Sequence, residues 1–465
     1  MKPTYLTSSL AGLALVVGCG QVEEIVHDAG ETADAPDATG SDAAAPDAHA
    51  GCDDGFTGED CGRCTVFVDG AEGDDDDAGQ SWSEPLATVQ AGIDLASARR
   101  TSESHDACDV WVRAGTYVPG AERSDSFVLT PGVDLYGGFA GDESARSQRD
   151  WHEYETILSG DIEQNDDPDD DDTLQDNAYR VVIGADDSRL DGFTVKAGAA
   201  QGDDEESRGG GLYNDSASPT IANTVFYRNS ADRGGAVYNA NESAPVITET
   251  RFSNNSARTQ GGALHNRDSA PYIESATFAE NTAVSVGGAV RNVRGELALV
   301  NAEFFRNQAG SEGGAVFNTG EESELVITNA TFTDNVAEVG GAISTSNSIS
   351  GLRVRNTILW ENVGTVEDSE IHFLSGEILI RHSIVQGGRP DGVQEDDFVS
   401  SLDENPLFVE AEATEPNLQL LADSPAINAG NSGLAVLEGV DHDLAGNPRV
   451  VGDDIDIGAY EFQSE

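Results

Sequence analysis

Five side chains of mixed chemistry recur at one position of a repeated motif. The motif is a glycine pair, a small residue, an apolar residue and a variable position, and the variable position holds Tyr213, Tyr238, His265, Arg291 and Phe317 in successive copies. If each apolar residue points inward on a β-strand, the next residue points outward, so the five would form an exposed column. Aromatic rings stack on sugar rings or anchor a protein partner, and His265 with Arg291 is the best acid–base pair that the column offers to a carbohydrate enzyme.

No catalytic triad, metal-ligand cluster or phosphate-binding loop accompanies this column in the sequence. We therefore interpret the five residues as a ligand face, and assign neither a catalytic residue nor a metal ligand. An irregular solvated face that tolerates any side chain is the alternative interpretation.

The positions of these residues depend on a repeat of about 26 residues between Gly209 and Asn362. The glycine pairs begin 25 to 27 residues apart, at Gly209, Gly234, Gly261, Gly287, Gly313 and Gly340. A second landmark is an apolar residue three positions before an asparagine, at Phe226/Asn229, Phe252/Asn255, Phe278/Asn281, Phe304/Asn307, Phe332/Asn335 and Leu359/Asn362. Such a period indicates stacked units that bury their apolar faces against their neighbours.

The residue types within each repeat indicate strands. Apolar runs are short and rich in β-branched residues, with Asn, Ser, Gly and Asp between them. Stacked coils place equivalent residues about 4.8 Å apart. We expect an inner stack of the five phenylalanines, an aliphatic stack of Ile221, Ile247, Ile273, Leu299, Ile327 and Val354, and asparagines that hydrogen-bond along their column. The prediction is an all-β protein, a parallel β-helix; ankyrin-like or leucine-rich solenoids need helical or leucine-periodic segments that are absent.

The first 18 residues have the form of a secretory signal. One cation, Lys2, precedes an apolar stretch that is too short to span a bilayer. The sequence Val16-Val17-Gly18-Cys19 resembles a bacterial lipobox, which implies cleavage before Cys19 and acylation of its thiol; the alternative is an ordinary signal peptide with a chance cysteine. Gly20 follows where an inner-membrane retention signal has Asp, so we expect a lipid-anchored protein of the outer membrane or cell surface.

Residues 19–50 after this signal predict a disordered acidic tether. They consist largely of Ala, Asp, Pro, Thr and Ser, which bury too little apolar surface to fold. Fully extended, the tether would reach on the order of 100 Å.

Four further cysteines, an even number, suggest disulfides in an exported protein. The stretch from Cys52 to Cys61 resembles the last loop of an EGF-like module, which implies a pair between these two and a half-module over residues 51–64. Cys64 would then pair with Cys108. A zinc site at Cys61-x-x-Cys64 is the rival interpretation, but a second ligand pair at metal spacing is lacking.

Residues 65–200 predict the N-terminal cap and first coils. Leu86, Val89, Ile93 and Ala96 fall on one helical face, as a lid over the first coil needs. The runs from Trp111 to Tyr117 and Leu135 to Phe139 resemble the first coils of right-handed parallel β-helix proteins of the pectate-lyase-like superfamily. The repeat block, residues 201–400, more specifically resembles the repeats of the polymorphic outer-membrane protein family, whose repeats are associated with surface adhesion.

The last segment, residues 401–465, resembles the terminal module that closes many bacterial surface β-helices. We interpret it as a C-terminal cap. Asp443, Arg449, Asp456 and Glu461 within it form either a buried charge network or a metal site, two alternatives that the sequence leaves open.

Charge restricts the partners. The chain has 85 acidic and 25 basic residues, a formal net charge of -60, so its surface repels nucleic acid, anionic headgroups and unassisted polyanionic substrates. This charge has three alternative interpretations: solubility at high salt, binding of divalent cations, and simple solvation of a secreted surface. Asp74 to Asp77 and Asp169 to Asp172 are the calcium candidates, but neither run matches a known calcium loop, and solvated loops are the alternative.

We therefore expect a surface lipoprotein whose β-helix binds a carbohydrate or extracellular protein, or serves as a structural spacer. A polysaccharide lyase or glycoside hydrolase of the same fold is the runner-up. An enzyme should show a concave cleft on which titratable side chains converge, whereas an adhesin or spacer should show flat, repetitive faces.

Overall fold

The computed structural model describes residues 63–103, 105–166, 171–201, 204–346, 350–367, 370–436 and 440–463. All of them belong to the unit Gly51–Glu465. The lipobox with Cys19, the tether of residues 19–50 and the pair Cys52 and Cys61 lie outside the described residues. No helix in the described ranges is both long and apolar enough to cross a membrane.

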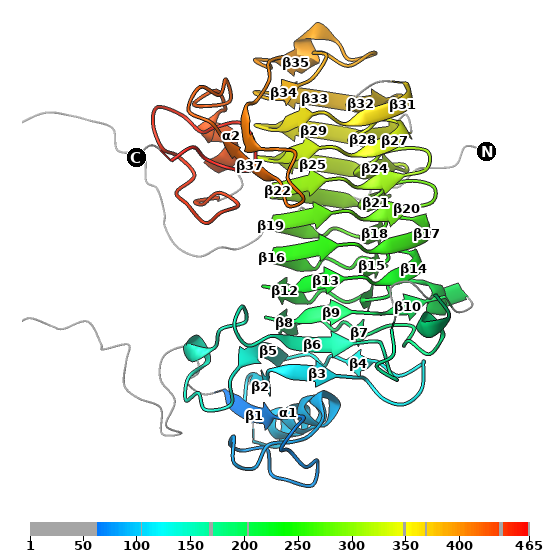
Figure 1. The fold of residues 1–465 in the computed structure, drawn as a ribbon, viewed down its shortest axis with the longest axis vertical. Coiled ribbons are helices and arrows are strands. Elements are labelled where there is room, and N and C mark those ends of the chain that lie inside the picture. Colours follow the sequence, from blue (N-terminus) through cyan, green and yellow to red (C-terminus); the bar gives the residue numbers. More distant parts are fainter. Residues whose placement is uncertain are drawn as a thin grey trace, which may run out of the picture. The chain divides into compact units, whose positions relative to one another are not determined.

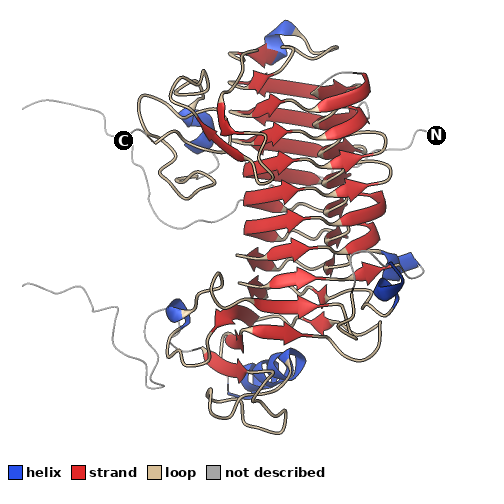
Figure 2. Cartoon of the chain, in the orientation of Figure 1, coloured by secondary structure: helices blue, strands red, loops and turns tan. Residues whose placement is uncertain are grey.

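The described chain winds through three parallel sheets, which confirms the expected parallel β-solenoid (Figure 1). Each repeat passes from a 19-stranded sheet, here the long sheet, to a seven-stranded sheet, turns at the glycine pair, and enters a nine-stranded sheet. Figure 2 shows the strands stacked, with short helices at their margins.

The long sheet contains β1 (Cys64–Val68), β2 (Cys108–Arg113), β3 (Gly115–Tyr117), β5 (Val133–Phe139), β6 (Thr156–Ser159), β8 (Arg189–Asp191), β9 (Thr194–Lys196), β12 (Thr220–Ala222), β13 (Val225–Tyr227), β16 (Val246–Ser253), β19 (Tyr272–Ala279), β22 (Glu296–Phe305), β25 (Glu324–Thr328), β26 (Thr331–Thr333), β29 (Gly351–Arg355), β30 (Ile358–Trp360), β33 (Glu377–Arg381), β34 (Ile384–Val385) and β35 (Phe398–Val399).

The nine-stranded sheet contains β4 (Phe127–Val128), β7 (Val182–Ile183), β11 (Leu212–Asp215), β15 (Val237–Ala240), β18 (Leu264–Arg267), β21 (Val290–Val293), β24 (Val316–Thr319), β28 (Ile343–Ser346) and β32 (Ile371–Phe373). The seven-stranded sheet contains β10 (Ala199–Ala200), β14 (Ser230–Arg233), β17 (Ser256–Gln260), β20 (Thr282–Ala283), β23 (Gln308–Ala309), β27 (Val336–Val339) and β31 (Val363–Glu367). The antiparallel pair is β36 (Phe408–Glu410) and β37 (Asn417–Leu420).

The interior matches the predicted stacks. Phe226, Phe252, Phe278, Phe304 and Phe332 are fully buried, with ring centroids 4.5 to 5.1 Å apart and nearly parallel planes. The aliphatic column beside them is also fully buried. A single apolar cluster runs from Cys64 to Val393, so the core is continuous across the boundary expected at residue 200.

The predicted asparagine column is a hydrogen-bonded ladder. The side chain of Asn281 accepts from the backbone and amide nitrogens of Asn255, both at 3.0 Å, and donates to Asn307 at 3.0 Å. Its amide also donates to the carbonyl of Phe252 at 2.9 Å. Asn229, Asn255, Asn307, Asn335 and Asn362 continue the same pattern, and this satisfies backbone groups that would otherwise be buried without partners.

The two glycines of each pair are needed for different reasons. Gly287 has φ of +65°, a left-handed conformation that favours glycine. A Cβ on Gly288 would collide with the backbone of the next coil, at Gln308 and Gly314. The corner between the seven- and nine-stranded sheets therefore depends on both members of the pair.

The predicted helix at the start of the solenoid is α1 (Val89–Glu103). Val89, Ile93 and Ala96 are buried and join the core cluster, and Leu86, just before the helix, is buried beside β1. Asp75, one of the calcium candidates, binds the residues before this helix, since its carboxylate accepts from Ala87 N, Thr88 N and Thr88 Oγ1, each at 2.9 Å. The second aspartate run lies partly outside the described residues.

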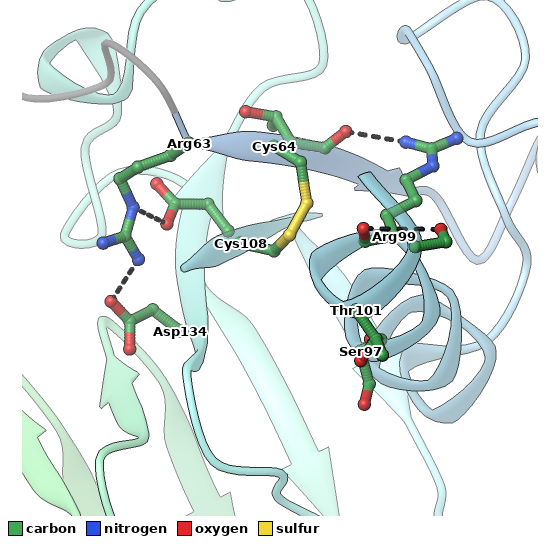
Figure 3. Close-up of a disulfide and its surroundings, with 10 residues drawn as sticks. Arg63, Cys64, Ser97, Arg99, Thr101, Cys108 and Asp134 are labelled. Atoms are coloured by element: carbon green, nitrogen blue, oxygen red, sulfur yellow. Dashed lines mark hydrogen bonds and ion pairs between the residues drawn. A yellow bond between two sulfur atoms is a disulfide. The ribbon is translucent and has the colours of Figure 1, made fainter. Parts of the chain in front are cut away.

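The disulfide between Cys64 and Cys108 confirms the second predicted pair (Figure 3). The two cysteines are register partners on β1 and β2, with Cα atoms 4.5 Å apart. Arg63 lies beside them and forms ion pairs with Asp109 and Asp134, each at 2.5 Å. The bridge therefore joins the first two coils.

The C-terminal segment, residues 401–465, was expected as a cap, but its described residues pack on the flank of the long sheet (Figure 1). They include β36, β37 and α2 (Ser432–Val436). Ala426, Ile457 and Leu420 form an apolar cluster with Ile358 and Ile384, which face outward from β30 and β34. Because these outward apolar residues need cover, the segment lies beside the coils, while β35 pairs with β33 at the last coil. We call residues 401–465 the C-terminal module.

Candidate functional site

A groove follows the long sheet between the C-terminal module and the loop around Trp151. It consists of two neighbouring cavities of about 830 and 440 Å³. His152, Glu249 and Arg251 line both cavities, so the two are continuous. The groove crosses several successive coils, as a site for an extended chain must.

The floor of the groove is a bend in the long sheet. One residue per coil adopts a left-handed conformation there: φ is 47° at Asn223, 46° at Glu249, 53° at Ser275 and 48° at Asn301. This bend divides each coil into two strands or two halves of one strand. Polar side chains of successive coils thereby line one lengthwise hollow.

Carboxylates gather at the wide end of the groove. Glu274 and Glu249 come from adjacent coils, and Asp441 comes from the C-terminal module. Tyr272 Oη donates to Glu274 Oε2 at 3.2 Å. Burial raises the pKa of Glu274, and the negative charges of Glu249 and Asp441 raise this pKa further. Glu274 therefore holds a proton more readily than an exposed glutamate.

The C-terminal module forms one wall of this end. Tyr460 Oη donates to Glu303 Oε2 at 2.8 Å, and Arg251 pairs with Glu415 at 2.8 Å. The side-chain amide of Asn301 donates to the carbonyl of His442, so the loop that carries His442 is attached to the floor. The wall is thus held by the coils that it faces.

A cluster of buried charged residues lies in the same module and binds its backbone. Asp443, Arg449, Asp456 and Glu461 are all at most 3% exposed. Asp443 accepts backbone hydrogen bonds from Asn447 at 2.8 Å and from Glu461 at 3.0 Å, and Arg449 donates to the carbonyl of Gly458. The charges of Glu461, Asp443 and Asp456 act on Arg449, but its hydrogen bonds go to backbone carbonyls. Among the described residues no group of three or more His, Cys, Asp or Glu is placed to hold a metal ion.

The smaller cavity, at the other end of the groove, carries an aromatic side chain. Trp151 is half-buried beside His152, with ring centroids 5.4 Å apart. The guanidinium of Arg149 lies 4.8 Å from the Trp151 ring centroid. An indole at the edge of a polar groove is suited to packing on a sugar ring.

The predicted ligand column is in register but is not exposed. Tyr213, Tyr238, His265, Arg291 and Phe317 are successive partners on β11, β15, β18, β21 and β24. Tyr238 is 0% exposed, His265 is 1% exposed and Tyr213 and Phe317 are buried, so the expectation of exposure was wrong. Strand alternation fixes the direction of a side chain but not what covers it.

Two kinds of neighbour cover these rings. Adjacent coils stack on their flat faces, with centroids of Tyr238 and Tyr213 5.8 Å apart and those of Tyr238 and His265 5.0 Å apart. Arginines from the preceding loops lie over them, Arg180 at 4.0 Å from the Tyr213 centroid and Arg208 at 5.5 Å from the Tyr238 centroid. The rings are therefore not available to stack on a ligand.

The expected acid–base pair, His265 and Arg291, is likewise covered by neighbouring side chains. Arg291 Nη1 and His265 Nε2 are 3.4 Å apart, so the two are neighbours as the spacing predicted. Burial lowers the pKa of His265 well below its ordinary value, and the charges of Arg291 and Arg233 lower it further. A buried, neutral imidazole has no access to a substrate in the groove, which lies on another sheet.

The groove residues do not share a position in the repeat. Glu249 and Glu274 occupy variable positions before the phenylalanine landmark, and His152 and Asp441 lie outside the repeats. The charged Thr248-Glu249-Thr250-Arg251 run, placed where neighbouring repeats are mostly uncharged, is the one local signal.

Comparisons with known proteins found a short family match and a distant structural similarity. Residues 249–267 match the family described as the Chlamydia polymorphic membrane protein (Chlamydia_PMP) repeat. A crystal structure of pectate lyase Pel9A aligns with 89% of this chain and 99% of its own, at 10% identity and a TM-score of 0.42. No curated protein matches the chain. The class of protein, a parallel β-helix, follows from the strand register itself.

Proposed function

We propose that this protein is a lipid-anchored surface β-helix that binds a neutral or amino-sugar-containing glycan in the groove of the long sheet. The observation that carries the proposal is the groove itself, which is polar, crosses several coils and ends at a wall built by the C-terminal module. Carboxylates accept hydrogen bonds from sugar hydroxyls and attract amino groups. A strongly negative chain would repel acidic glycans from a groove lined by Glu249, Glu274 and Asp441.

The proposed location rests on the N-terminal sequence. The lipobox-like run ending in Cys19 and the acidic stretch that follows favour a tethered protein of the outer membrane or cell surface. A tether would hold the groove clear of the headgroups, where a glycan of the same or another cell is within reach.

Binding is tested with a glycan array probed by the full chain in mild detergent. We expect retention on neutral or amino-sugar glycans, and a loss of at least tenfold in affinity when Glu249→Gln and Glu274→Gln are combined. Glu296→Gln, an exposed carboxylate on β22, is the matched control and should leave affinity unchanged. Equal binding by the double variant and the wild type would refute the groove as the site.

Cleavage of the bound glycan is the second candidate function. The cleft with converging titratable groups is the feature expected of an enzyme rather than of a spacer, and Glu274, with its raised pKa, is the candidate acid. A lyase would release unsaturated sugars that absorb ultraviolet light, and a hydrolase would release reducing ends. If Glu274→Gln still binds the glycan but releases no product, cleavage is supported. If the wild type holds the glycan intact, the protein binds it without cleaving it.

A further inference from the structure

Three arginines come from the corner between the seven- and nine-stranded sheets. Arg208 and Arg233 are bridge partners on adjacent coils. Arg291 reaches back toward them, since its Nη1 donates to Gln260 Oε1 at 2.5 Å and lies 3.4 Å from His265 Nε2. We call Arg208, Arg233 and Arg291 the arginine strip.

No carboxylate of the described residues forms an ion pair with the strip. Other arginines pair with carboxylates, such as Arg258 with Asp232 at 2.5 Å and Arg294 with Asp268 at 2.8 Å. Within the described ranges, none of the three strip arginines makes such a pair. This is unexpected in a chain with 85 acidic and only 25 basic residues.

Like charges at the strip repel one another. Burial lowers the pKa of Arg291 to about 10, and the neighbouring charge of Arg233 acts in the same direction. Burial is the largest cause of the lowered pKa of His265, and the charges of Arg291 and Arg233 lower it further. The empty protein therefore carries an electrostatic cost at this corner.

Polar atoms in the strip also lack partners. In the described structure, the hydroxyl of Tyr238, a side chain that is 0% exposed, makes no hydrogen bond. The Nε atoms of Arg208 and Arg291 are buried and likewise have no acceptor. Buried donors without acceptors are uncommon because each costs about 1 to 3 kcal/mol.

We propose that the arginine strip binds a small ligand with two or three oxyanion groups spaced about 5 Å apart. Arg208 and Arg233 stand on successive coils, and Arg291 reaches back to Gln260 on the coil after Arg233, which sets that spacing. Arginine recognises carboxylate, sulfate and phosphate through paired hydrogen bonds. Such a ligand supplies both the missing charge and the missing acceptors. Because the chain as a whole repels long polyanions, the ligand is a short one. The site lies on other sheets than the groove and does not depend on the proposed glycan function.

The test uses citrate and inorganic tripolyphosphate as probes, with acetate and inorganic phosphate as single-oxyanion controls at one ionic strength. We expect calorimetry on the full chain to show at least tenfold tighter binding of one oligovalent probe than of its control. The better probe distinguishes carboxylate from phosphate chemistry. Equal binding of all four anions would overturn the proposal.

Arg233→Gln should change stability and anion affinity in opposite directions. Arg233 makes no ion pair within the described part of the chain, so its replacement should raise the midpoint of thermal unfolding without anion, and lower probe affinity at least tenfold. Arg258→Gln, on the neighbouring β17, is the control and should retain binding. Arg208→Gln should repeat the loss of binding if Arg233→Gln folds poorly. Equal losses in Arg258→Gln and Arg233→Gln would mean nonspecific attraction and would contradict a built site.

Discussion

Tyr460 and Glu303, 157 positions apart in the chain, are joined by a hydrogen bond of 2.8 Å between the phenol and the carboxylate. This contact attaches the C-terminal module to the long sheet at the edge of the groove. Glu303 is buried, and its second oxygen accepts from Thr277 Oγ1 at 3.0 Å. Burial raises the pKa of Glu303.

The stability that Glu303 contributes should therefore fall as the pH rises, because burial raises its pKa more than the hydrogen bonds from Tyr460 and Thr277 lower it. A carboxyl whose pKa is raised on folding contributes stability that is complete below its unfolded pKa and is lost as the pH passes its folded pKa. A tenfold difference in proton affinity corresponds to about 1.4 kcal/mol. Glu303→Gln, which resembles the protonated form, should flatten the fall in thermal midpoint above the ordinary carboxyl pKa. An unchanged pH slope in this variant, with Glu296→Gln as control, would contradict the assignment.

Phe278→Ala should be among the most damaging core substitutions. The ring lies 4.7 Å from that of Phe252 and 4.5 Å from that of Phe304. Truncation of a buried phenylalanine costs about 3 to 5 kcal/mol. Urea unfolding measures the loss, and Val284→Ala, at a side chain that is 72% exposed, should change stability by less than about 0.5 kcal/mol. Equal midpoints for the two variants would argue against the stack.

Asn281→Ala should cost about as much as the loss of an aromatic ring. It removes the acceptor of the Asn255 backbone N–H and the side-chain donor to the Phe252 carbonyl, and each buried group left without a partner costs about 1 to 3 kcal/mol. The exposed Gln308→Ala, one coil further on, is the control for urea unfolding. If Asn281→Ala lowers the free energy of unfolding no more than the control does, water replaces the hydrogen bonds of the missing side chain.

Replacing Cys64 and Cys108 by serine should loosen the first coils selectively. The bridge closes a separation of 44 residues, for which chain entropy predicts about 4 kcal/mol. Hydrogen exchange should rise in β1, β2 and α1 and stay unchanged in the coils around Phe278. Uniform exchange across the whole solenoid would mean that the first coils unfold together with the rest.

Cys19→Ser should abolish lipid attachment, because only a thiol accepts the diacylglyceryl group. Partition into Triton X-114 measures it, with the wild type in the detergent phase and the variant in the aqueous phase or uncleaved. Cys52→Ser is a control that keeps the lipobox. Equal detergent-phase recovery of Cys19→Ser and wild type would exclude the lipoprotein proposal.

The sequence by itself determined the interior of this protein. Phe252, Phe278 and their counterparts recur at the period of one coil, so their stacking follows from the repeat. The asparagine ladder follows for the same reason. The even number of cysteines, with the EGF-like resemblance of Cys52 to Cys61, predicts Cys108 as the partner of Cys64. Local periodicity suffices wherever a contact joins equivalent positions of adjacent coils.

Only the tertiary structure decided the surface. Arg208 covers Tyr238 because the glycine corner brings a preceding loop across the ring, and strand alternation carries no information about such cover. The groove joins His152, Glu274 and Asp441, which share no repeat position. Their meeting depends on the C-terminal module packing beside the coils, and that placement follows from outward apolar residues such as Ile358, which no period marks.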